Sequence, residues 1–134
     1  MSYALTTTVD QPFESTLQAT RSALSEQGFG ILSEIELAAT LKAKLDADIA
    51  PQVILGACRP PLAHAAIQAE PSIGLLLPCN VVVRSLEDGR TIVEAMDPAI
   101  MVTVTGNHNL ADVSADARNR LNTALASVAA SATA

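Results

Sequence analysis

Two cysteines, Cys58 and Cys79, are the residues of this chain best suited to chemistry. Each lies near a proline at the edge of an apolar segment: Pro60 comes shortly after Cys58, and Pro78 directly precedes Cys79. A thiolate is both a nucleophile and a soft metal ligand, so this cysteine pair could act as a redox centre or bind copper(I), zinc or haem iron. The 20 residues between the cysteines match no short ligand motif such as C-x-x-C. They form one site only if the two segments converge in the fold.

Free cysteines often serve as small buried hydrophobic residues, which is the alternative interpretation of both thiols. His64 follows Cys58 closely and is the third candidate ligand of a Cys-Cys-His metal set. Its position opposite Leu62 on a predicted helix instead favours a side chain exposed to solvent. The metal-site interpretation therefore names Cys58, Cys79 and His64.

Polar residues flank the same segments. Glu94, Asp97 and Asn80 would supply acid-base chemistry if they gathered at a pocket. Alternatively, Asp97 caps a turn that begins at the next residue, and Glu94 is an exposed strand residue. Arg59, at the start of a predicted helix, could bind an anion, although the prolines that follow remove N–H donors. The candidate ligand-binding residues are Cys58, Cys79, Asn80, Asp97, Glu94 and Arg59. No residue is assigned a catalytic role, and the cofactor stays unnamed.

The composition limits the class of partner. The chain has 134 residues and a mass of 13.9 kDa, which fits one domain over residues 1–134 with a frayed tail at about 131–134. Aromatic residues make up only 2 % and the net charge is −6, which disfavours nucleic acid and an anionic membrane as partners. No run of about 18 apolar residues and no signal-peptide pattern occurs. We expect a cytoplasmic protein whose cysteines stay reduced.

The hydrophobic pattern predicts alternating strands and helices. A Thr-rich strand over 3–9 precedes a helix that starts near Gln11 and stops at Gly28. The remaining predicted strands lie at 53–58, at 75–86 and at 29–37, where alternating apolar residues predict a half-buried strand. The remaining predicted helices are a short one at 37–45 that Pro51 terminates, one from Pro60 and a long one from Leu110. We expect the helices near Gln11 and Leu110 to pack on one face of a mainly antiparallel sheet.

The dipeptide Asp88-Gly89 is the strongest turn signal in the chain. A two-residue turn at this position would pair Val83 with Glu94 and would bring Asn80 opposite Asp97. In that register Glu94 lies on the same sheet face as Val83 and Cys79, because side chains alternate between faces. The hairpin would then carry the polar candidates to the cysteines.

Three motifs carry a resemblance to a known family. Gly56-Ala57-Cys58-Arg59-Pro60, the run from Leu75 to Val83, and Asp97-Pro98 follow in this order behind a strand-helix-strand opening. Together they resemble the bacterial and archaeal domain-of-unknown-function family 302, over nearly the whole chain. The resemblance implies an α+β fold of β-α-β-β-β-β-α type, with a sheet layer and a helix layer similar to the TATA-box-binding-protein arrangement, and often a dimer. It implies no activity.

Three classes of function follow from these residues. The first is a non-enzymatic homodimeric module that binds a small apolar or soft ligand near Cys58 and Cys79. The second is a thiol or metal site, with copper, zinc or haem, that handles electrons or sulfur. The third is an enzyme that uses Asp97 and Glu94. The first is favoured because no nucleophile-base pair is visible, and because an aliphatic sheet is readily buried by a second subunit.

Overall fold

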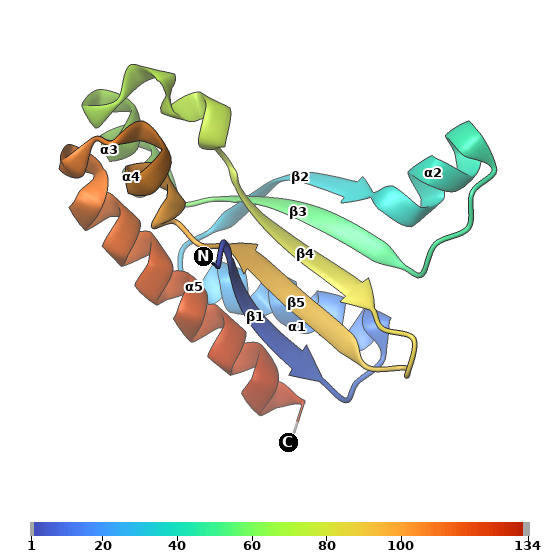
Figure 1. The fold of residues 1–134 in the computed structure, drawn as a ribbon. Helices are drawn as coiled ribbons and strands as arrows, with labels where there is room; N and C mark the ends of the chain where they lie inside the picture. The colour runs from blue at the N-terminus through green and yellow to red at the C-terminus, as the bar shows by residue number, and fades with distance from the viewer. Residues whose placement is uncertain (1, 133–134) are drawn as a thin grey trace.

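A computed structural model describes residues 2–132 of the chain. The elements follow in the order β1 (Ala4–Val9), α1 (Phe13–Glu26), β2 (Gly30–Glu36), α2 (Leu37–Leu45), β3 (Gln52–Cys58), α3 (Pro60–Ala69), the 3-10 helix η1 (Pro71–Leu76), β4 (Cys79–Ser85), β5 (Thr91–Met96), α4 (Ile100–Thr105), the 3-10 helix η2 (His108–Leu110) and α5 (Ala111–Ser131). The strands form one antiparallel sheet in the order β1-β5-β4-β3-β2 (Figure 1). The predicted α+β class is confirmed. The helices α2 and α3 occur where the hydrophobic pattern predicts them, and together with α4 they add to the β-α-β-β-β-β-α order that the resemblance implies.

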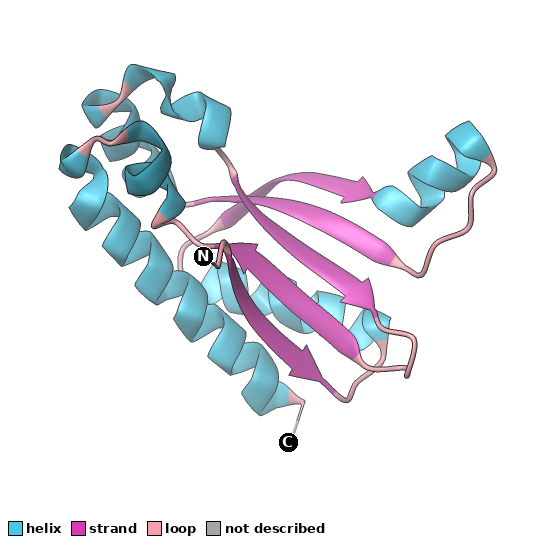
Figure 2. Ribbon diagram, viewed as in Figure 1, coloured by secondary structure: helices cyan, strands magenta, loops and turns pink. Residues whose placement is uncertain are grey.

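The main core lies between the sheet and two helices, α1 and α5, which cover the same face (Figure 2). Both helices bury a stripe of residues spaced three or four apart, among them Leu17 and Leu24 in α1 and Leu121 and Val128 in α5. These stripes meet the inward side chains of the strands, which include Leu55, Val81, Val83 and Val93. The prediction that the helices near Gln11 and Leu110 share one face is therefore confirmed.

The opposite face of the sheet, here called the open face, is not covered by α1 or α5. Its outward side chains on the three central strands are Gln52, Ile54, Asn80, Val82, Arg84, Ile92, Glu94 and Met96. All of them except Asn80 are half-buried, whereas their inward neighbours are buried. The sheet thus has one face that is buried beneath α1 and α5 and one face whose side chains are only partly shielded from solvent.

The hairpin between β4 and β5 differs from the predicted register. The loop has three residues instead of two: the N–H of Leu86 donates to the carbonyl of Arg90 at 2.8 Å, and Gly89 adopts a φ of 87°. As a result Val83 pairs with Val93, and Glu94 pairs with Val82. A shift of one residue moves every side chain to the other face, so Glu94 lies on the open face, away from Cys79.

The segment that follows α1 also departs from its pattern. A bulge between Ile31 and Ser33 interrupts the expected alternation of β2, and every residue of this edge strand is exposed. The predicted half-buried strand is therefore wrong. The short helix α2 is present but ends at Asp46, which adopts a left-handed φ of 53°, well before Pro51.

Two other boundaries complete the comparison. Leu75 and Leu76 belong to η1, so β4 begins only at Cys79, after Pro78. The predicted tail is part of α5 up to Ser131, and residues 133 and 134 lie outside the described residues. Within residues 2–132, no helix combines the length and the apolar character that crossing a bilayer requires.

Candidate functional site

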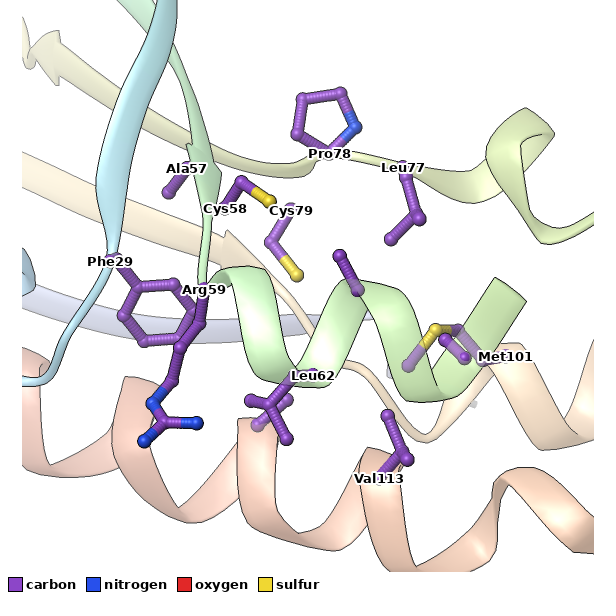
Figure 3. Close-up of a pocket in the computed structure, with 13 residues that line it drawn as sticks. Phe29, Ala57, Cys58, Arg59, Leu62, Leu77, Pro78, Cys79, Met101 and Val113 are labelled. Carbon is purple, nitrogen blue, oxygen red and sulfur yellow. The ribbon is translucent and has the colours of Figure 1, made fainter. Parts of the chain in front are cut away.

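The ends of β3 and β4 bring the two cysteines to one pocket. Ala57 pairs with Cys79 across the two strands, and Cys58 is the next residue of β3. Both cysteines line the same cavity, here called the thiol pocket, and Figure 3 draws both side chains among the residues of its wall. Both are free thiols, so no disulfide joins them. The two residues thus line one cavity, and that they act together as one site stays a prediction.

The local sequence explains how this corner of the fold is built. Pro60 and Pro61 start α3 directly after β3, because the first turn of a helix needs no N–H partner at those positions. The carbonyl of Arg59 accepts hydrogen bonds from the N–H groups of Leu62 and Ala63, both at 3.0 Å. The chain therefore turns at once from the strand end into a helix that forms one wall of the pocket.

The rest of the wall is apolar. Side chains from five elements and the segments beside them contribute to it, including Phe29, Leu62, Ala66, Leu77, Met101 and Val113. The cavity has a volume of ≈ 20 Å³ for water-sized spheres, which is about the space that one water molecule occupies. A single ion fits this space as it stands, whereas an organic ligand requires side chains to move apart.

The buried thiol of Cys79 is held in its neutral form. Burial raises the pKa of Cys79 to about 11, and the charge on Cys58 contributes in the same direction. A cysteine reacts as a nucleophile or binds a metal only as its thiolate. Since Cys79 stays protonated at neutral pH, it is a poor nucleophile there. A metal ion that binds here must displace its proton.

Arg59 is the charged residue in the wall of the thiol pocket. Its Nε is buried and has no hydrogen-bond partner. The side chain lies against Gly28, where an added Cβ would come within 3.1 Å of that Nε and where φ is 83°. Figure 3 shows the guanidinium below Phe29, directed towards α5. This cation would favour a negatively charged group bound nearby.

His64 does not join the cysteines. It is exposed on α3 and is absent from the wall of the thiol pocket, since Leu62 occupies the face that points to the cavity. Across residues 2–132, no cluster of three or more His, Cys, Asp or Glu side chains is arranged to hold a metal ion. The proposed three-ligand set of Cys58, Cys79 and His64 is therefore not assembled.

The other polar candidates lie elsewhere. Asn80 and Glu94 line a shallow hollow of ≈ 360 Å³ on the open face, where the Nε of Arg84 donates to Glu94 at 2.8 Å. Asp97 accepts a hydrogen bond from the N–H of Ala99 at 3.0 Å and forms an ion pair with Arg118 at 3.3 Å. The structure thus separates Asn80, Glu94 and Asp97 from the thiol pocket, and the capping interpretation of Asp97 agrees with its contacts.

The wall also contains residues that the sequence did not indicate. Met101 comes from α4 and Val113 from the first turns of α5, and neither stood out as a candidate. The spacing of Leu110, Val113 and Ala117 was a usable signal, because it marks the face on which α5 packs. Met101 carried no signal, since it lies between Pro98 and Leu110, where no helix or strand was assigned from the sequence.

Comparison with known proteins gives a family and a fold. The family model described as "Domain of unknown function DUF302" matches residues 5–128. A crystal structure of an uncharacterised conserved DUF302 protein from Bacillus stearothermophilus is similar, with a TM-score of 0.88 and 26% sequence identity over 96% of this chain and 99% of that chain. No curated protein matches.

Proposed function

Because this chain belongs to the DUF302 family, whose description assigns no function, we propose a function from the thiol pocket itself. The protein is a non-enzymatic module that works as a homodimer and binds a small apolar or soft ligand beside Cys58 and Cys79. The observation that carries this proposal is the meeting of two free thiols with an apolar wall in one cavity.

Binding is favoured over catalysis by the state of the reactive groups. Cys79 is held protonated by burial, so it lacks the thiolate that a nucleophile needs. Glu94 is engaged by Arg84 on the open face, and Asp97 by Arg118. The carboxylates that would act as acid or base therefore lie outside the thiol pocket.

The size and chemistry of the pocket favour a single soft ion among the possible ligands. Copper(I) binds thiolates and accepts low coordination numbers, so two sulfur atoms suffice for it, whereas zinc in structural sites takes four ligands. Two thiolates and copper(I) carry a net charge of −1, which Arg59 would balance. Haem does not fit the ≈ 20 Å³ cavity. The proposed site needs reduced thiols, so we propose that it works in a reducing compartment such as the cytoplasm.

An anaerobic titration with copper(I) against a chromophoric chelator tests the proposal. We expect one copper(I) per chain for the native protein, and loss of tight binding in Cys58→Ser and in Cys79→Ser. His64→Ala is the control, because His64 is exposed outside the pocket, and it should bind as the native protein does. Circular dichroism of each variant checks that the fold is retained. Equal binding by the native protein and both serine variants would contradict a soft-ion site at the thiols.

A further inference from the structure

The open face of the sheet carries a continuous apolar row. Ile35 of β2 pairs with Ile54 of β3, and Ile54 pairs with Val82 of β4. Ile92 and Met96 of β5 lie on the same face. Across residues 2–132 no helix of the main core packs on this row, because α1 and α5 lie on the other side of the sheet. The row therefore stays accessible in a single copy of the chain.

A second apolar surface adjoins the row. The segment of residues 30–50, here called the arm, comprises β2, α2 and the loop that follows, and it extends beyond the end of the sheet in Figure 1. None of the residues of α2 is buried, and the exposed fractions of Leu32 and Leu45 are 69% and 71%. A helix of nine residues is marginal in water unless its apolar side packs against something. Although β2 pairs with β3, the apolar side chains of α2 thus remain incompletely covered within the chain.

We propose that a second copy of this chain covers the open face and the arm, in a two-fold symmetric dimer. This proposal rests on the homodimer included in the proposed function and assigns its interface. A two-fold contact brings the same patch of each copy together, so the patch must tolerate itself. The charged strand residues on the open face are Arg84 and Glu94, and they already form an ion pair at 2.8 Å. On the sheet, two copies can therefore meet without opposing unpaired like charges, although each chain carries a net charge of −6. In the arm, Glu34 is paired with Arg21, and Lys42 is paired with Asp46 and Asp48.

The area of the surface is also adequate. Five strands spaced ~4.8 Å apart and up to seven residues long, at ~3.4 Å per residue, make a face of roughly 550 Å². The exposed apolar side chains of α2 and the loop after it add to this face and bring the total towards the ~800 Å² that each partner buries in a standard stable interface. Sheets that pack face to face in this way interdigitate their side chains at a spacing of ~10 Å.

Light scattering coupled to size-exclusion chromatography tests the proposal on the native protein and on Val82→Arg. We expect twice 13.9 kDa for the native protein at micromolar concentration. Val82 lies opposite Glu94, so an arginine there gains an opposite charge within its own sheet and leaves the fold intact. In the dimer it would place two extra cations at the centre of the interface. We expect the dissociation constant to rise at least ~100-fold.

Two further variants locate the interface. Leu45→Ser removes an exposed apolar side chain of the arm and should weaken the dimer, whereas Leu75→Ser is the matched control. Leu75 is 88% exposed on η1, away from the open face and the arm, so its substitution should leave the dimer unchanged. Hydrogen exchange of the native protein gives a readout free of substitutions: the amides of β2 and α2 should exchange more slowly in concentrated than in dilute solution.

A native protein that remains a monomer at all concentrations overturns the proposal. So does a dimer that survives Val82→Arg, or one that only Leu75→Ser dissociates, because either places the interface elsewhere. Failure of the ligand proposal is distinguishable from both. If the native protein binds no copper(I) but forms a dimer that Val82→Arg dissociates, the proposed interface is supported and the proposed soft-ion site is refuted.

Discussion

Alkaline pH should destabilise this protein through Cys79. Burial, followed in size by the charge on Cys58, raises the pKa of the Cys79 thiol from 9.0 to about 11. The unfolded chain keeps the ordinary pKa, so between these two values the unfolded state has lost its proton while the folded state still holds it. The contribution of Cys79 to stability is therefore complete below about pH 9 and is lost as the pH rises to about 11.

The size of the effect follows from the same two values. One pKa unit corresponds to about 1.4 kcal/mol, so the interval from 9.0 to about 11 amounts to roughly 3 kcal/mol. A domain of this kind is stable by ~5–15 kcal/mol in total. The loss is therefore large enough to measure by chemical denaturation.

The matched variant is Cys79→Ala, which keeps a small apolar side chain and removes the titrating group. Urea denaturation of both proteins, with a reductant present, gives the free energy of unfolding from pH 8 to pH 11. Apart from position 79 the two proteins have the same sequence, so the difference between their curves reports the thiol of Cys79 and its interaction with Cys58. We expect the advantage of the native protein over the variant to fall by roughly 3 kcal/mol across this range. Two parallel curves would refute the reasoning, because the thiol would then titrate alike in the folded and unfolded states.

Two predictions concern packing. Gly56→Ala should lower the free energy of unfolding by ~1–3 kcal/mol, because the added Cβ would overlap the Oγ of Ser33 and would lie 3.0 Å from Cγ of Pro78. Recovery of stability in the double variant with Ser33→Ala would identify the overlap with Ser33 as the cause. Leu121→Ala should lower the free energy of unfolding by ~2–5 kcal/mol, since Leu121 is only 1% exposed between α5 and the sheet. Leu75→Ala, at an exposed residue, should change it by less than ~0.5 kcal/mol. Equal losses of stability in the two variants, measured by thermal or urea denaturation, would contradict the position of the core.

The elements that could be predicted are those whose local signals agree with one another. The stripe from Leu17 to Leu24 and the one from Leu121 to Val128 have a period of 3.6, and both helices form where they were expected. Pro60 correctly marked the point where β3 ends and α3 begins, whereas the predicted strand at 75–86 ran through Pro78, after which β4 begins. Because these prolines lie beside Cys58 and Cys79 in the sequence, they also pointed to the region of the thiol pocket.

The remaining differences come from choices that the sequence leaves open. Asp88-Gly89 fits a two-residue turn, but a glycine with positive φ also closes a three-residue loop, and the carboxylate of Asp88 accepts a hydrogen bond from the N–H of Arg90 in the loop that forms. That single residue moves Glu94 to the open face. In the same way, the bulge after Ile31 has no sequence signature, and it breaks the alternation on which a half-buried strand was predicted.

The claim that Cys58 and Cys79 act together on one soft ligand is tested most directly by X-ray absorption at the copper edge, on protein loaded anaerobically with one equivalent of copper(I). We predict two sulfur ligands per copper in the native protein and loss of this signature in Cys79→Ser, whose hydroxyl is a poor ligand for a soft ion. Coordination of the metal by nitrogen or oxygen atoms, or a spectrum that Cys79→Ser leaves unchanged, would contradict the claim.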